Sequence, residues 1–153
     1  MNEGAPFDEY GLVSASRRLH AAIDQLDETA ARAISVSRND LRCINLLENG
    51  PRSPSELAEA LGLTRGSMTT LLDRLETRDY VERVAHPTDR RGLLIKLKPK
   101  VFRELASVYK PVGSSLVALA NEYGSAVTEV LAQQLETIAE RYEHAAKRND
   151  RKG

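Results

Sequence analysis

Residues 53–77 read SPSELAEALGLTRGSMTTLLDRLET, a stretch that contains two helix starts separated by a tight turn. Ser53 and Glu56, with a proline directly after the serine, form the first start: an N-cap, a proline at the first helical position and a capping-box glutamate. Gly62 ends this short helix, and Thr64 can cap the next one two residues later. Two short helices joined this closely predict a helix-turn-helix.

The second helix of this pair has one apolar and one polar face. The apolar face consists of residues at three- and four-residue steps: Met68, Leu71, Leu72 and Leu75. Such a stripe packs against a core, so the opposite face must meet solvent. That face is small and polar toward its N-terminal end, with Gly66 and Thr70 followed by Asp73 and Thr77. Small side chains let a helix enter the DNA major groove, which is about 12 Å wide. An ordinary surface helix, the alternative, explains neither the tight turn nor the hairpin that follows.

Two strands are predicted after this helix, at Tyr80–His86 and Leu93–Lys98, around the loop PTDRRG. Apolar and polar side chains alternate in the second strand, as in a half-buried hairpin. An arginine at the tip of a narrow loop can enter the minor groove, where the negative potential is strong. Arg90 and Arg91 are the candidates, and Asp89 is placed to orient one of them through a charge-assisted hydrogen bond.

The charges of the chain are unevenly distributed although they sum to zero, with 22 basic and 22 acidic side chains. Residues 65–103 hold ten basic side chains against five acidic ones, whereas residues 1–50 hold five against eight and residues 104–143 two against six. A basic segment between acidic flanks gives the protein one face that attracts phosphates. A solvated charged surface is the alternative interpretation of the same pattern.

Long amphipathic helices are predicted on both sides of this region. Apolar residues recur at helical steps from about Asp8 to Ala33, and Ser37 can cap a further helix. Residues 99–123 and 125–148 follow the hairpin with the same helical spacing, and Pro111 predicts a kink or break in the first of them. These helices expose more apolar surface than a small winged domain can cover, so self-association is their simplest use.

We therefore expect a mainly α (α+β) fold, a winged helix-turn-helix flanked by N- and C-terminal dimerisation helices. The expected parts are a DNA-binding domain at 37–98, a dimerisation region at 8–34 and 99–148, and flexible ends at 1–7 and 149–153. The side chains expected at the dimer interface are Leu12, Leu19, Val127, Leu131, Leu135, Ile138 and Tyr142.

The motif residues resemble a known family, the multiple antibiotic resistance regulator (MarR) type of bacterial transcription factor. The resemblance lies in SELAEALGLTRGSMTTLLDRLE at 55–76, YVER at 80–83 and HPTDRR at 86–91, and the pattern of flanking helices agrees with it. This chain departs at Asp79, where many members have glycine, and at LKPKV from residue 97, where many have LTPKG. Aspartate tolerates the left-handed conformation of a helix end, so neither departure threatens the fold.

The resemblance implies a homodimeric regulator that binds a pseudo-palindromic operator in double-stranded DNA. Repression is the expected sign of regulation, and a small-molecule effector is expected to release the protein from DNA. A protein-interaction module and a non-specific DNA-binding protein are the alternative functions. The residues expected to contact DNA are Ser53, Thr64, Arg65, Ser67, Thr69, Thr70, Arg74, Asp89, Arg90 and Arg91.

Several other classes of protein are not expected. The sequence shows no nucleophile placed beside a base, so we expect no enzyme. It has a single cysteine and three scattered histidines, so we expect no cofactor and no metal. No apolar run approaches the roughly 20 residues that span a bilayer, which predicts a cytoplasmic protein without a membrane partner. Cys43 is expected to be buried rather than to sense oxidants. For His86, a phosphate contact and simple exposure are equally open.

Overall fold

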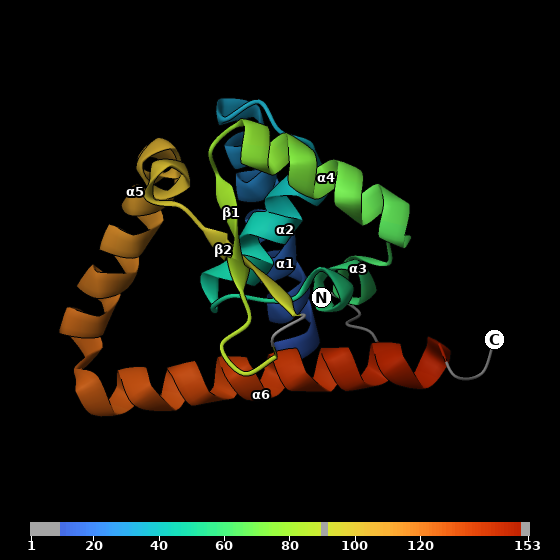
Figure 1. Cartoon of the computed structure of the whole chain (residues 1–153). Coiled ribbons are helices and arrows are strands. Elements are labelled where there is room, and N and C mark those ends of the chain that lie inside the picture. The colour runs from blue at the N-terminus through green and yellow to red at the C-terminus, as the bar shows by residue number, and fades with distance from the viewer. Residues whose placement is uncertain (1–9, 90–91, 151–153) are drawn as a thin grey trace. The chain divides into compact units, whose positions relative to one another are not determined.

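The computed structural model describes residues 10–89 and 92–150 of the chain. Within these ranges it is mostly helical with one two-stranded sheet, which confirms the expected fold class (Figure 1). The elements are α1 (Leu12–Ala33), α2 (Arg38–Glu48), α3 (Pro54–Leu61), α4 (Arg65–Thr77), β1 (Val81–Ala85), β2 (Leu93–Leu97), α5 (Pro99–Tyr123) and α6 (Ser125–Asp150). The chain divides into two compact units, residues 1–109 and 110–153, and α5 begins in the first and ends in the second.

The predicted N-caps are confirmed. Ser37 and Ser53 each accept the backbone N–H of the residue three positions on, whose carboxylate accepts the serine N–H in return. Thr64 caps α4 by accepting the N–H of Ser67. The start predicted for the first helix is wrong by four residues, because Gly11 takes a left-handed conformation with φ of 68° and α1 begins at Leu12.

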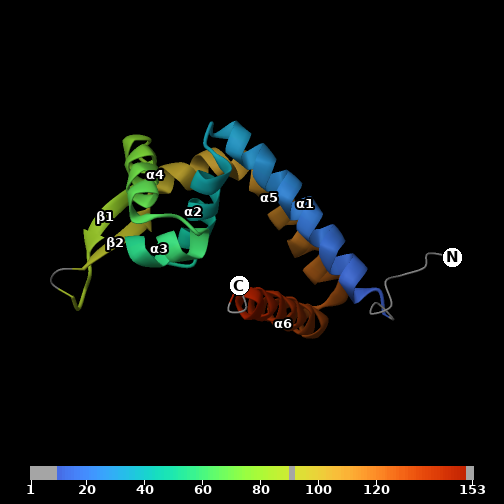
Figure 2. The same cartoon turned by 90° about the vertical axis from the view of Figure 1, so that its right-hand side faces the viewer.

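The core of the first unit joins every element from α1 to the start of α5. In Figure 2, α2 lies between α1 on one side and α3, α4 and the β-hairpin on the other. The buried apolar side chains include residues of α2, α3, α4, both strands and the first turns of α5. The largest fully buried ones include Leu41, Ile44, Leu57, Met68, Leu71, Leu75 and Ile95. Each of the two short helices of the motif is therefore held by its apolar face.

The hairpin pairs β1 and β2 in antiparallel register, with Val81 opposite Leu97 and Ala85 opposite Leu93. Arg52, just before α3, forms a further bridge to Ile95: each backbone N–H donates to the other's carbonyl, at 3.1 and 2.8 Å. Ile95 and Leu97 are buried and Lys96 is exposed, as predicted, whereas Leu93, next to the loop, is exposed, so the predicted alternation holds over residues 95–97 only. The hairpin is thus fastened to the start of α3 by backbone hydrogen bonds as well as by packing.

The second unit consists of the rest of α5 and all of α6. α5 continues through Pro111, so the helix is not broken there, although the sequence predicts a kink or break at this proline. Gly124, with φ of 80°, separates the two helices as predicted. α6 runs to Asp150, so residues 149 and 150, expected in a flexible end, belong to the helix. In the described part of the chain no helix is both long and apolar enough to cross a membrane.

Candidate nucleic-acid interface

The turn between α3 and α4 sets where α4 begins. Gly62 takes φ of 65°, a left-handed conformation that glycine adopts without steric cost, and Leu63 N–H donates back to the Ala58 carbonyl at 2.9 Å. Thr64 then caps α4: its Oγ1 accepts the Ser67 N–H at 3.2 Å and its hydroxyl donates to Ser67 Oγ at 2.9 Å. Two of the expected DNA contacts, Thr64 and Ser67, therefore meet at the exposed N-terminal end of α4.

The two faces of α4 are separated as the sequence predicts. Met68, Leu71, Leu72 and Leu75 are at most 2% exposed. The small polar side chains of the other face are all exposed: Gly66, Ser67, Thr69, Thr70, Asp73 and Thr77. The core holds the buried face of α4. A rotation of α4 that turned its solvent face inward would therefore remove these four apolar side chains from the core.

The threonine hydroxyls on this face have a defined orientation. Thr69 donates to the Arg65 carbonyl at 3.0 Å and Thr70 donates to the Gly66 carbonyl at 3.2 Å. Each hydroxyl hydrogen is therefore used inside the helix, which leaves the oxygen lone pairs and the methyl group turned outward. Acceptors of this kind match the amino groups of adenine and cytosine, and the methyl matches that of thymine.

Arg65 and Thr69 also share a shallow hollow between α3 and α4. Its other lining residues are Pro54, Ser55, Ala58 and Met68. The hollow brings the first turn of α3 beside the first turn of α4. A phosphate backbone could contact both helix starts there, because the backbone N–H groups at helix N-termini favour anions.

Ser53, another expected contact, is occupied within the protein. Its hydroxyl donates to the Glu56 carboxylate at 2.7 Å, and its Oγ accepts the Glu56 N–H at 3.2 Å. The Ser53 backbone N–H and hydroxyl lower the pKa of Glu56 below its usual range. Ser53 thus stabilises the start of α3, and a contact with DNA would be additional to that role.

Arg74 is brought to a buried carboxylate rather than left on the solvent face alone. Its Nη2 lies 2.7 Å from Asp40 Oδ1, and Asp40, 4% exposed, is the buried charged residue of the described core. The second oxygen of Asp40 accepts the Ser37 N–H at 3.1 Å. Directly after the last residue of α4, Arg78 Nη1 donates to the Ile34 carbonyl at 3.3 Å. Arg74 and the C-cap Arg78 therefore attach α4 to the corner between α1 and α2.

Arg83 is a side chain that the sequence interpretation missed. From β1 it pairs with Asp73 at 2.6 Å and with Glu76, both on the exposed side of α4. The two acids lie three residues apart on one helix face, but Arg83 is opposite the buried Ile95 in the hairpin, so strand alternation did not mark it as a partner. The ion pairs join the hairpin to α4.

The loop of the hairpin carries the remaining expected contacts. Asp89 is exposed. Arg90 and Arg91 lie outside the described residues, so their expected contacts with DNA stay predictions.

Cys43 is buried as expected. Burial, with a smaller contribution from Asp40, raises the pKa of its thiol to about 12. A thiol of this kind is protonated near neutral pH and therefore a poor nucleophile. In the part of the chain that is described, no group of three or more histidine, cysteine or acidic side chains is arranged to hold a metal ion.

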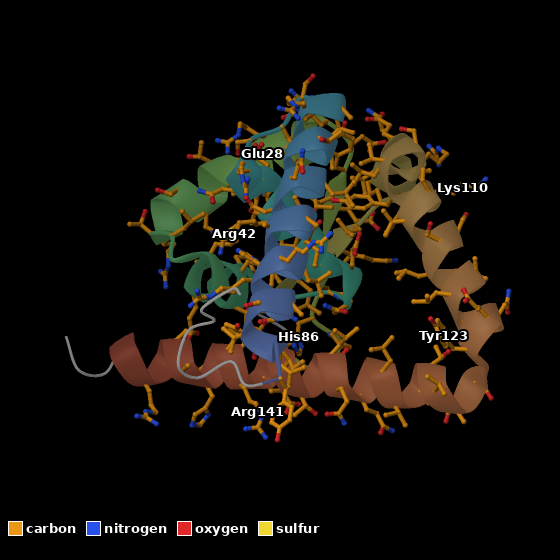
Figure 3. The ribbon with its side chains drawn as sticks, turned by 180° about the vertical axis from the view of Figure 1, so that it is seen from behind. Glu28, Arg42, His86, Lys110, Tyr123 and Arg141 are labelled. Carbon is orange, nitrogen blue, oxygen red and sulfur yellow. The ribbon has the colours of Figure 1, made fainter. Side chains whose placement is uncertain are left out.

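The side chains expected at a dimer interface are solvent-accessible in the single chain. Leu12 and Leu19 on α1 are 62% and 46% exposed, and Val127, Leu131 and Leu135 on α6 are between 43% and 54% exposed. Ile138 is half-buried and Tyr142 exposed. Figure 3 labels Tyr123 at the end of α5, where it too is exposed.

Comparison with known proteins places this geometry in a family. A family model described as MarR family matches residues 34–92, from the end of α1 to the hairpin. The uncharacterized HTH-type transcriptional regulator YcgE of Bacillus subtilis is 32% identical over 120 residues, which cover 78% of each protein. The chain belongs to the MarR family. This membership confirms that it is a DNA-binding transcriptional regulator rather than an enzyme.

Two further comparisons extend this result. The transcriptional repressor MprA of Escherichia coli is 36% identical over 91 residues, which cover 60% of this chain and 49% of MprA. The solved structure of NadR in complex with 4-hydroxyphenylacetate matches with a TM-score of 0.56 at 23% identity, over 91% of this chain and 96% of NadR. The second match shows that this chain shares the fold of NadR over nearly its whole length.

Proposed function

We propose that this MarR-family chain represses transcription by binding, as a homodimer, to a pseudo-palindromic operator. The observation that carries the proposal is the exposed face of α4, on which small hydroxyl side chains stand at the N-terminal end while the apolar face is fully buried. Such a helix can enter the major groove end-first. The hairpin follows directly and is tied to α4 by Arg83, so it can reach the adjacent minor groove.

In this proposal the two elements read DNA differently. Thr69 and Thr70 contact base edges, since their outward oxygens and methyl groups suit base readout. Arg65, Thr64 and Ser67 contact the phosphates next to the helix start. The arginines of the loop, Arg90 and Arg91, enter the minor groove, and Asp89 orients one of them.

A dimer is supported by the exposed apolar side chains of α1, α5 and α6. Leu116 and Val117 of α5, for example, are 60% and 61% exposed. A two-fold dimer would place two recognition helices about 34–36 Å apart, one turn of DNA. The operator would then be a pair of half-sites with that spacing.

The sign of regulation and the effector are inferred from relatives. MprA is named a transcriptional repressor and is 36% identical to this chain over 91 residues, so we infer repression by occupation of a promoter. NadR was solved with 4-hydroxyphenylacetate, so we infer that a small molecule releases this chain from DNA. Because bacterial operators are cytoplasmic, we infer that the chain acts there.

The test is selection of genomic fragments with the purified protein, followed by binding measurements on the recovered site. We expect a two-fold symmetric site bound by a dimer. Thr70→Ala should relax the base preference at one position of each half-site, whereas Thr137→Ala on α6, which removes the same kind of helix-internal hydroxyl, should leave the selected site unchanged. Equal binding to all duplexes would indicate a non-specific DNA-binding protein, and no DNA binding a protein-interaction module.

A further inference from the structure

His86 lies at the end of β1, where the chain turns into the loop of the hairpin. Its ring Nδ1 receives the backbone N–H of Asp89 at 3.1 Å and that of Thr88 at 3.3 Å, and the Thr88 hydroxyl lies 3.3 Å away. A backbone N–H can only donate, so Nδ1 must present a lone pair to it. The geometry therefore requires that Nδ1 carry no proton.

The surroundings of this ring are closely packed. His86 N–H donates to the Gly92 carbonyl at 3.1 Å, and Gly92 N–H donates to the Asp89 carbonyl at 2.9 Å. A Cβ placed on Gly92 would lie 2.8 Å from His86 Cβ and 3.0 Å from Asp89 Oδ2, which leaves no room for a side chain. The ring thus acts as aspartate or asparagine does in an Asx turn, by accepting amides two and three residues ahead.

We propose that His86 is a positioning residue for DNA binding: its neutral ring, unprotonated at Nδ1, holds Thr88 and Asp89 in the turn that leads to Arg90 and Arg91, and protonation of the ring releases that turn. This inference rests on the proposed function, in which the two arginines contact DNA. It is an alternative to the phosphate contact and to simple exposure, the two interpretations that the sequence leaves open for His86.

The proposal predicts the sign of a pH effect. Among the described residues, the charged groups near the ring are Glu56 from α3 and Asp89 from the turn itself. Histidine is the side chain that ordinarily changes charge between pH 5 and 8. If Nδ1 were protonated, it would become a donor and could no longer accept the N–H groups of Thr88 and Asp89. Acid should therefore weaken DNA binding, whereas a histidine that merely adds positive charge near phosphates would strengthen it.

The experiment uses the full chain, the selected operator duplex and two variants. His86→Asn keeps an acceptor that does not titrate, and His86→Ala removes the acceptor. Affinity is measured by fluorescence anisotropy at fixed ionic strength from pH 8 to pH 5.5. At pH 8 we expect His86→Ala to bind about 2- to 10-fold more weakly, the loss of one or two hydrogen bonds, and His86→Asn to bind within about twofold of the wild type. On acidification the wild type should lose affinity for DNA relative to His86→Asn. His144→Asn, a matched control on α6, should show the same dependence of DNA affinity on pH as the wild type.

A second readout does not depend on DNA. ¹⁵N NMR of the free protein at pH 8 should show Nδ1 unprotonated, and the Thr88 and Asp89 amide signals should shift together as the ring titrates. A protonated Nδ1 at pH 8, or wild-type affinity that rises in acid relative to His86→Asn, would overturn the proposal. If the wild type binds no duplex at any pH, the proposed function fails and the role of His86 in DNA binding fails with it. An unprotonated Nδ1 in that case locates the failure in the function rather than in the turn. Should His86→Ala not fold, the comparison of the wild type with His86→Asn decides.

Discussion

Individual side chains in this chain have their roles set by what surrounds them. Asp40 is an ordinary capping-box residue by its position in sequence, yet only its Oδ2 serves the cap, and its Oδ1 is the partner of Arg74 on α4. Cys43, three residues farther along the same helix, faces the core and is fully buried. The same short helix therefore contributes one buried charge that needs a partner and one thiol that has no access to solvent.

Removal of Arg74 should destabilise the fold through Asp40. Arg74→Ala leaves a carboxylate that is 4% exposed without its cationic partner, and we expect a loss of about 1–3 kcal/mol in the free energy of unfolding. The loss stays below that of a fully buried pair because the arginine is itself half exposed. Urea denaturation measures it. The double variant Asp40→Asn with Arg74→Ala keeps the cap and removes the charge, so it should recover part of the loss; a double variant as unstable as the sum of the singles would contradict the pairing.

Cys43 should be unreactive in the folded protein. With the pKa of the thiol raised to about 12 by burial, almost no thiolate forms at pH 8. We expect labelling with iodoacetamide at pH 8 to be negligible without denaturant and complete in urea, as measured by mass spectrometry. Rapid labelling of the native protein, or loss of DNA binding with one equivalent of peroxide, would instead support a redox role.

At the scale of elements, the recognition helix is held at both ends by different means. Its N-terminal end is defined by the Thr64 cap after a left-handed glycine, and its middle and C-terminal parts are held by ion pairs from Asp40 and Arg83. Asp79 ends the helix with φ of 63° and pairs with Lys98 after β2. The hairpin is thus connected to the helix at each of its bases, which lets the two elements meet DNA as one body.

The loop of the hairpin should contribute separately from its strands. Arg91→Ala is expected to weaken operator binding by about 1–3 kcal/mol at fixed salt. Lys96→Ala is the matched control, since it removes one positive charge from β2, where Lys96 lies near Glu82. Equal losses for the two variants would mean that only net charge matters, and an unchanged affinity for Arg91→Ala would remove the loop from the interface.

At the scale of the whole molecule, the exposed apolar surface exceeds what a monomer needs. The apolar stripe of α6 has no cover within the described part of its own unit, and isolated helices of this kind seldom leave such a stripe in water. A second copy of the chain is the occupant that the proposed two-fold symmetric operator would require.

Leu135→Arg should therefore produce monomers. A charge in the centre of an apolar helix interface costs more than the interface can compensate. Light scattering should give half the mass of the wild-type particle. Glu140→Arg, which lies on the opposite side of the same helix from the apolar stripe, should remain dimeric. A dimeric Leu135→Arg would exclude this stripe from the interface, and a monomeric wild type would exclude the dimer.

The sequence by itself determined the elements that depend on local hydrogen bonds and on periodic burial. The three N-caps, the left-handed Gly62, the apolar face of α4 and the alternation in β2 all involve residues within a few positions of one another, so their patterns are visible in the chain. The helix-turn-helix and its exposed polar face follow from them.

Only the tertiary structure decided which charged and polar groups meet. Arg74 reaches Asp40 across 34 residues, and Arg83 reaches Asp73 across ten, distances along the chain that no periodicity encodes. The amide donors on His86 depend on how the hairpin closes, and the start of α1 on the conformation of one glycine. Side-chain partners are set by the packing of whole elements, whereas helix starts are set by the few residues around them.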